Sequence, residues 1–240
     1  MSRRAALTLV IWFAAGHLPV AAQKAKRETV VQGKAVSAWV KDLQGQALLP
    51  RVRAVNALML AGPEARGAAP ALLAVFGEKD ATLLQPLAAV ALSRIGGDAV
   101  PDLRKGLASK GGGVRAGAAL TLGLIGPMAG AAAPDLARAL GDEDVAVRQA
   151  SAQALGRLEG TARSALPALG GALHDPDPAV RVEAAWALWR VSGQTSGVGA
   201  MTAALNGDNP ALAQRAAAVA GDMADRAKAA APRLREPAGE

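Results

Sequence analysis

Cysteine is absent from the 240 residues of this chain. Its absence excludes disulfide bonds, thiolate metal sites, cysteine nucleophiles and a lipid-modified cysteine after an export signal. Aromatic residues are also scarce, at 2% of the sequence. A single thick core of large side chains is hard to build from such a composition, so we expect thin layers that are stabilised by close packing.

Histidine is nearly absent as well. His17 lies in an N-terminal segment that we interpret below as an export signal, and His174 lies in a predicted turn. No histidine pair is therefore left for metal ligation or for an acid–base relay. The serines have no nucleophile elbow around them, and glycines 111–113 are not followed by the Gly-Lys-Ser/Thr of a phosphate loop. We predict no catalytic residue, no cofactor and no enzyme activity.

Two acidic clusters, at 142–144 and at Asp175 and Asp177, could suggest calcium. The glycine and the distant glutamate of a calcium-binding loop are missing from both. Helix capping explains these carboxylates better, so we predict no metal site.

The N-terminal residues have the pattern of a secretory signal. Arg3 and Arg4 precede an apolar run at 5–15, and the small residues Val20 and Ala22 close the segment. The apolar run is too short to span a bilayer comfortably. We predict a signal peptide at 1–22 and export to the periplasm or the medium, with an uncleaved anchor or a twin-arginine signal as the alternatives.

Charge gives little indication of a nucleic-acid partner. The formal net charge of +7 falls to +5 without Arg3 and Arg4, and the remaining lysines and arginines are scattered. Aromatic side chains that could stack on bases are nearly absent. We therefore expect no nucleic-acid partner, and contact with a membrane only through an uncleaved anchor.

The abundant residues predict an all-α fold. Hydrophobic residues make up 51% of the sequence, which excludes a disordered chain. Alanine and leucine favour helix, and no segment shows the sustained period-two alternation of strands.

The chain repeats itself about every 33 residues. Two independent markers keep this spacing: the pairs Val114-Arg115, Val147-Arg148 and Val180-Arg181, and the prolines Pro101, Pro134 and Pro167. Earlier in the chain, Val52-Arg53 and Pro70 fall one spacing before Gln85 and Pro101, with slightly shorter gaps. We predict about six units between residues 35 and 235, a linker at 23–34 before them and a disordered tail at 236–240.

Each unit is predicted to contain one long and one short helix. In one long helix, Val147, Ser151, Leu155 and Leu158 follow Asp144 at helical spacing and form a core stripe. Asp177-Pro178 and Asn209-Pro210 place a capping side chain before a proline and so mark the start of further long helices. Segments such as 133–140 and 164–173 carry the short helices. A unit of this size cannot bury its stripe alone and must stack on its neighbours.

The recurring signature is a turn aspartate, then Val-Arg, then Ala-Ala-x-Ala-Leu-Gly or a close variant. Its best matches are at 142–158 and 175–191. This signature resembles HEAT repeats, especially the short HEAT-like repeats of the phycobilisome-lyase type, over about residues 35–235. The resemblance implies an α-solenoid, a right-handed superhelix of about six two-helix repeats.

The resemblance also implies a structural ladder in which turn aspartates pair with arginines of the same or the adjacent repeat. The residues placed for it are Asp144, Asp177, Arg115, Arg148 and Arg181. A row of arginines that binds a polyanion is the alternative, but aspartates of the same period can neutralise it. Gly111 to Gly113 replace the turn aspartate in one unit and Gln85-Pro86 replaces Val-Arg in another, so we expect these two units to be looser.

A candidate binding face follows from the helical register. The positions one, five and eight residues after the repeated arginine lie opposite the core stripe. In the fifth unit they hold Val182, Trp186 and Trp189, and Leu120 lies nearby in register. Exposed tryptophans often anchor protein interfaces. The alternative is that the tryptophans pack on each other and on Arg148 or Arg157.

These observations predict a non-catalytic scaffold or adaptor that binds a protein or peptide along its long helices. The rival class is an enzyme or nucleic-acid-binding protein of HEAT-like architecture. A bilin lyase would have to show chromophore absorbance, and a DNA glycosylase would need a basic concave face and a cytoplasmic location.

Overall fold

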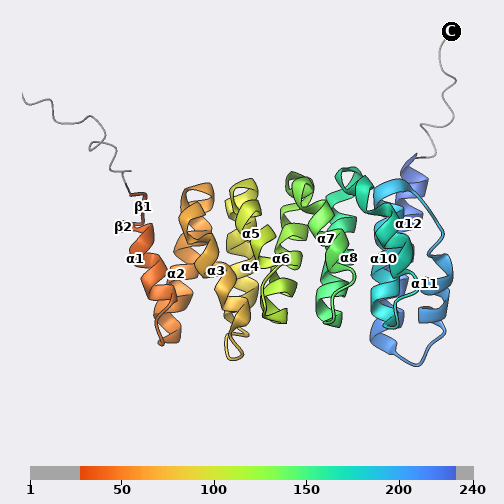
Figure 1. Cartoon of the computed structure of the whole chain (residues 1–240), viewed down its shortest axis with the longest axis horizontal. Coiled ribbons are helices and arrows are strands. Elements are labelled where there is room, and N and C mark those ends of the chain that lie inside the picture. The colour runs from red at the N-terminus through yellow and green to blue at the C-terminus, as the bar shows by residue number, and fades with distance from the viewer. Residues whose placement is uncertain (1–27, 231–240) are drawn as a thin grey trace, which may run out of the picture.

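The computed structural model describes residues 28–230, with side chains to residue 225, as a row of paired helices (Figure 1). The predicted signal peptide at 1–22, His17 and the predicted tail at 236–240 lie outside these residues. The elements are β1 (Val30–Val31), β2 (Lys34–Ala35), α1 (Val36–Leu43), α2 (Leu48–Ala61), α3 (Ala69–Ala74), α4 (Leu84–Ile95), α5 (Val100–Gly106), α6 (Gly112–Ile125), α7 (Ala133–Ala139), α8 (Val145–Leu158), α9 (Leu166–Ala172), α10 (Pro178–Ser192), α11 (Val198–Leu205) and α12 (Pro210–Ala230).

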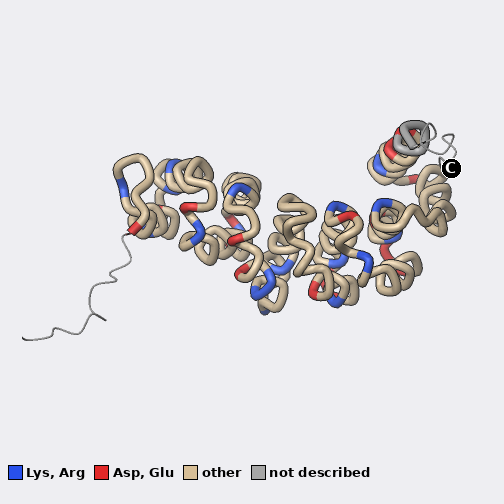
Figure 2. The backbone as a smooth tube through the Cα atoms, turned by 90° about the horizontal axis from the view of Figure 1, so that it is seen from above, with Lys and Arg blue, Asp and Glu red and all other residues tan. Residues whose placement is uncertain are grey.

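Within residues 28–230, the helices form an α-solenoid of six pairs, each with a short helix followed by a longer one. The long helices from α2 to α10 pack side by side in one layer, and the short helices pack against them as a second layer. Seen from above, the row bends so that both of its ends turn to the same side, which we call the concave side (Figure 2). The predicted all-α solenoid is confirmed.

The core lies between the two layers and follows the predicted stripe. Val147, Ser151, Leu155 and Leu158 of α8 are all fully buried. Their counterparts in the short-helix layer include Leu136 of α7 and Leu169 of α9, which are buried to the same degree. One continuous apolar cluster therefore runs along the array from α1 to α10, as expected for units that bury their stripes on their neighbours.

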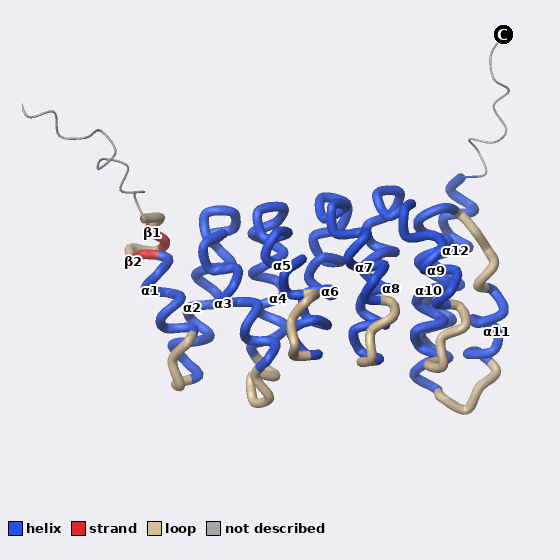
Figure 3. The backbone as a smooth tube through the Cα atoms, viewed as in Figure 1, coloured by secondary structure: helices blue, strands red, loops and turns tan. Residues whose placement is uncertain are grey.

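A sharp turn after each of the long helices α2, α4, α6 and α8 leads through a 3-10 segment into the next short helix. A loop joins α10 to α11 instead (Figure 3). Gly62, Gly96 and Gly126 make the sharp turn with φ between 56° and 73°. In the fourth unit Glu159 adopts the same conformation with φ 53°, a region that side chains normally avoid. Its carboxylate pairs with Arg190 of the next long helix, which links this strained turn to the stacking of the following unit.

The N-terminal end of the array carries a small hairpin where the sequence predicts a linker. Strands β1 and β2 pair antiparallel over residues 30–35. The indole nitrogen of Trp39 donates to the carbonyl of Val31 at 2.9 Å, and Val31 is buried. Part of the predicted linker at 23–34 is therefore folded, because Trp39 of α1 anchors the hairpin at the open end of the first unit.

One segment, Gly112–Ala139, is long and apolar enough to cross a membrane by length and composition. In the structure it is not one straight helix, because α6 ends before Gly126, where φ is 72°, and α7 begins at Ala133. In its most apolar window, 56% is buried inside the array. Its hydrophobicity therefore corresponds to core packing between neighbouring units.

Candidate functional site

The repeated arginines join each unit to the next. Arg115 makes two hydrogen bonds to the carboxylate of Asp142, at 2.7 and 2.8 Å. Arg148 makes the same pair of bonds to Asp175, at 2.8 and 3.0 Å. A third nitrogen of each arginine donates to carbonyls in the turn before its own helix. Each arginine thus fixes its own turn and the turn of the following unit.

The aspartates predicted for this ladder are the wrong ones of each turn. Asp144 and Asp177 cap the helix N-termini instead: Asp144 accepts from the backbone N–H of Ala146, and Asp177 accepts from Ala179 at 2.8 Å. The ladder carboxylates come two residues earlier, at Asp142 and Asp175, each of which also accepts the backbone N–H of the capping aspartate. A backbone turn separates the two roles, and helical periodicity does not reveal it.

The ladder extends to the first unit but skips one step. Arg51 pairs with Glu78 at 2.6 Å, again 27 residues apart, so the first unit uses Arg51. Arg53, which marks the Val-Arg series in the sequence, is exposed. The position 27 residues after Gln85 is Gly112. Gln85 thus stands at the arginine position of the ladder and Gly112 at the carboxylate position, so no ion pair can form at this step. The side chain of Gln85 instead donates to the carbonyl of Glu78 in the turn before its own helix.

Packing replaces the missing pair between α4 and α6. A side-chain carbon at Gly117 would lie 2.2 Å from the ring of Phe76, so the glycine makes room for the buried phenylalanine. Pro86 lies in the first turn of α4, where a backbone N–H has no helical acceptor in any case. The two atypical units thus join through an aromatic contact.

The ladder aspartates are held in their charged form. Burial alone would raise the pKa of Asp142, but the hydrogen bonds from Arg115 and the Asp144 N–H, with the charges of Arg115 and Arg148, lower this pKa below 3.8. Burial opposes the same shift at Asp175, where the bonds from Arg148 and Asp177 lower the pKa.

These lowered pKa values predict acid-sensitive stability. A group with a lower pKa in the folded state stabilises the fold above its unfolded pKa and loses this effect as the pH falls through the folded value. We expect the free energy of unfolding to fall below about pH 4. The Asp142→Asn/Asp175→Asn variant should lose roughly 1–3 kcal/mol per pair at neutral pH and show a flatter acid profile in urea titrations.

The exposed Asp80 supplies the matched control, because Asp80→Asn removes a carboxylate with no ladder role. An acid profile of the double variant as steep as that of the wild type would contradict the assignment.

The ladder geometry also argues against a polyanion-binding arginine row. The N–H groups of Arg115 and Arg148 already donate to carboxylates and to turn carbonyls.

The predicted binding face at the fifth unit is covered. Val182 is fully buried and Trp186 is 9% exposed, because α11 and α12 pack over them and form a second apolar cluster with them. Trp189 is half-buried at the edge of this cluster. The expectation that these three residues lie exposed is therefore wrong. The register is correct, since they do lie opposite the core stripe, on the concave side.

Trp186 sits in a defined pocket of polar and cationic groups. Its indole nitrogen donates to Asp222 of α12 at 3.1 Å. The guanidinium groups of Arg190 and Arg215 lie 5.5 and 5.4 Å from its ring centre, within the range of cation–π attraction. Gly156 of α8 provides the space, because a side-chain carbon there would lie 2.5 Å from the ring. Packing is therefore the role of Trp186, on other arginines than those predicted.

A buried ion pair fastens α12 beside this tryptophan. Both oxygens of Glu183, which is 1% exposed, accept from Arg215 at 2.6 Å. Sequence reasoning missed this pair, because the 33-residue spacing predicts no partner for Glu183.

The rest of the concave side stays open on α2 to α8. The exposed or half-exposed apolar residues in register with Trp186 and Arg190 form a surface that we call the concave patch: Leu60, Val90, Leu120 and Leu124. Of the predicted face, Leu120 alone belongs to this patch. Arg94 and Arg157 lie in the same register beside it. The helical register correctly included Leu120 in the predicted face, but that face was centred on the tryptophans because they are the larger side chains.

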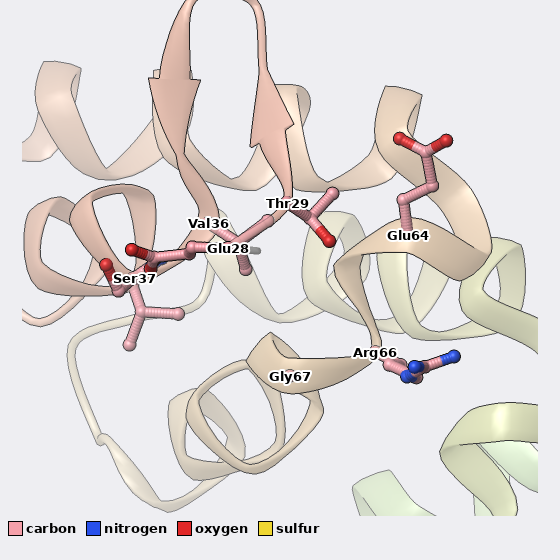
Figure 4. Close-up of a pocket in the computed structure, with 8 residues that line it drawn as sticks. Glu28, Thr29, Val36, Ser37, Glu64, Arg66 and Gly67 are labelled. Atoms are coloured by element: carbon pink, nitrogen blue, oxygen red, sulfur yellow. The ribbon is translucent and has the colours of Figure 1, made fainter. Parts of the chain in front are cut away.

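A pocket also lies elsewhere, at the N-terminal end. It is an open pocket of about 590 Å³ between α1 and the turn before α3. Figure 4 shows Glu28 and Ser37 on one side of it and Glu64 and Arg66 on the other, with charged ends that do not converge. Glu28 accepts from the backbone of Ser37, and Arg66 lies 3.7 Å from Asp98. Within residues 28–225, no group of three or more potential metal ligands is found.

Paired helices, a continuous core and an arginine–aspartate ladder define an α-solenoid of helical repeats. Family models agree: the model for HEAT repeats matches residues 100–175, and the model for a single HEAT repeat matches residues 165–193. Residues 100–193 of the chain therefore match HEAT repeats. No curated protein matches it.

Among the solved structures that are similar to this chain, two with a TM-score of at least 0.50 share its fold. One is from the complex of CpcE and CpcF of phycocyanin lyase from Nostoc, with 26% identity, a TM-score of 0.51 and coverage of 80% of this chain and 77% of that chain. The YibA protein of Escherichia coli has 21% identity and a TM-score of 0.50, over 75% of this chain and 67% of its own. A designed armadillo repeat protein in complex with the peptide (KR)4 has 16% identity and a TM-score of 0.45, over 78% and 99% of the two chains.

Proposed function

We propose that this chain is a non-catalytic scaffold that binds a protein partner on its concave patch. The observation that carries the proposal is a row of exposed apolar side chains on the concave side of α2, α4 and α6. Leu60 is 70% exposed, Leu124 42% and Val90 39%. Exposed apolar residues gathered on one face favour a protein interface, whereas the pocket beside α1 has no converging catalytic groups.

The Nostoc neighbour supports a protein partner, because its structure is that of a complex between two chains. An activity like that of the lyase would require a chromophore, and absorbance of the mature chain after mixing with a bilin tests it directly. We further propose that the partner is met outside the cytoplasm, on the strength of the signal pattern at 1–22.

The experiment is a pull-down from the exported fraction with the mature chain, residues 23–240. We expect Leu124→Glu to reduce capture of the main partner by roughly tenfold or more, because a carboxylate would be buried against an apolar surface. Ala74→Glu adds the same charge at an exposed position of α3, in the short-helix layer, and should leave capture unchanged. Equal capture by the wild type and Leu124→Glu would place the interface elsewhere.

A further inference from the structure

The last helix pair does not continue the array. The repeat places Asp208 one unit after Asp175, where Arg181 would complete a further ladder pair. Arg181 instead donates to the carbonyls of Asp175 and Pro176 at 2.7 and 3.0 Å, and no Arg181–Asp208 ion pair exists among the residues described. In Figure 2, α12 stands off the row on the concave side, near the letter C. It therefore lies across the concave side of α10 and leaves the long-helix row.

Helix α12 thus shows what the concave side can hold. It presents an apolar stripe of Leu212, Ala216, Val219 and Met223, at the spacing of one face of a helix. Beside the stripe, Asp222 reaches the indole nitrogen of Trp186 and lies 3.7 Å from Arg190. The concave surface of the fifth unit is therefore covered by an amphipathic helix, α12, with a carboxylate beside its apolar stripe.

The two preceding units offer the same surface without an occupant from the described chain. One repeat before Arg190 stands Arg157 of α8, and Gln153 takes the place of Trp186. One repeat further back, α6 contributes Leu124 and Leu120. Arg157 crosses to α6, because a side-chain carbon at Gly123 would lie 3.5 Å from its Cδ. The leucines and the guanidinium group therefore lie side by side.

Charge at this surface is unbalanced. Arg157 is half-buried and has no ion pair within the described residues. Burial lowers the pKa of its guanidinium group; the negative charge of Glu183 raises this pKa, and the positive charge of Arg215 lowers it. Arg94 of α4 lies in the same register, and the concave positions of α4, α6 and α8 hold no carboxylate: Pro86, Val90, Arg94, Ala116, Leu120, Leu124, Gln149, Gln153 and Arg157. The Glu183 carboxylate that acts on Arg157 is already paired with Arg215, and a half-buried guanidinium without an ion-pair partner of its own favours an acidic ligand.

We infer that the partner contributes an acidic amphipathic helix. Its apolar side packs on Leu120 and Leu124 between α6 and α8, and a carboxylate binds Arg157, as α12 with Asp222 does one unit later. This inference rests on the proposed function, since it names the kind of partner that binds the concave patch. The helix-in-groove mode needs apolar anchors at helical spacing and a charged flank, and the exposed face of α6 and α8 supplies both.

The test uses two synthetic peptides of about 20 residues, long enough to form a helix. Both carry one stripe of leucine and alanine; the stripe is flanked by glutamates in the first and by lysines in the second. By fluorescence anisotropy with the mature chain, we expect the glutamate peptide to bind at least about tenfold more tightly, since charge-assisted hydrogen bonds are at stake. Arg157→Gln should remove most of this difference.

Arg138→Gln is the matched control, because Arg138 of α7 is 74% exposed in the short-helix layer. Equal affinity for the two peptides, no binding of the glutamate peptide, or an undiminished difference in Arg157→Gln would overturn the inference. The pull-down separates this failure from that of the proposed function. Partner capture that depends on Leu124 with a negative peptide result would leave the scaffold standing and exclude an acidic helix as its ligand.

Discussion

Leu155→Asp should unfold the array. Leu155 of α8 is fully buried between the two layers, in the continuous core. An aspartate there would place a carboxylate among apolar side chains with no partner and would also remove the packing of the leucine. We expect a loss of about 4–5 kcal/mol or more in the free energy of unfolding, which is a large share of the stability of a domain of this size. Circular dichroism during a thermal ramp measures it.

Ala146→Asp provides the control within the same helix. Ala146 is exposed in the first turn of α8, where a negative charge interacts favourably with the helix dipole. This variant should melt within a few degrees of the wild type. If Leu155→Asp also melted like the wild type, the predicted core register of the long helices would be refuted.

Arg215→Ala should release the last helix pair while the rest of the array stays folded. The substitution leaves the carboxylate of Glu183, which is 1% exposed, without its partner. Breaking a buried pair in this way costs about 3–5 kcal/mol, and we expect roughly 2–3 kcal/mol here because Arg215 itself is 35% exposed. The apolar cluster under α12 is separate from the main core, so the loss should stay local.

Hydrogen exchange followed by mass spectrometry resolves this prediction. Amides of α11 and α12 should exchange faster in Arg215→Ala, and those of α6 and α8 should keep their wild-type protection. The double variant Glu183→Leu/Arg215→Ala should regain part of the protection, because an apolar residue replaces the buried charge. Unchanged exchange in α12 of the single variant would show that the ion pair does not fasten the hairpin.

Local sequence patterns predicted the architecture because the same pattern recurs in each unit. The stripe at Val147, Ser151, Leu155 and Leu158 is fully buried as expected. Asp177 before Pro178 caps the start of α10. Such features depend on helical periodicity and on capping chemistry, which act within a few residues of each other.

The errors concern contacts that the repeat does not encode. Asp142 and Asp144 are both turn aspartates, and the three-dimensional course of the turn decides which of them faces Arg115. Trp186 lies on the concave side as the register requires, but α12 leaves the 33-residue pattern and covers it. A helix that folds back over a neighbour creates burial without a local signal, so the tryptophans could not be distinguished from an open interface by spacing alone.

Site-specific photo-crosslinking tests most directly whether a protein partner binds the concave side of the array. A photo-reactive amino acid in place of Leu124, on the open concave side of α6, is compared with one in place of Arg138, on the short-helix layer. Irradiation of cells that produce the chain should crosslink one recurrent partner from position 124 and none of it from position 138. Crosslinks to that partner from position 138 alone would contradict the account.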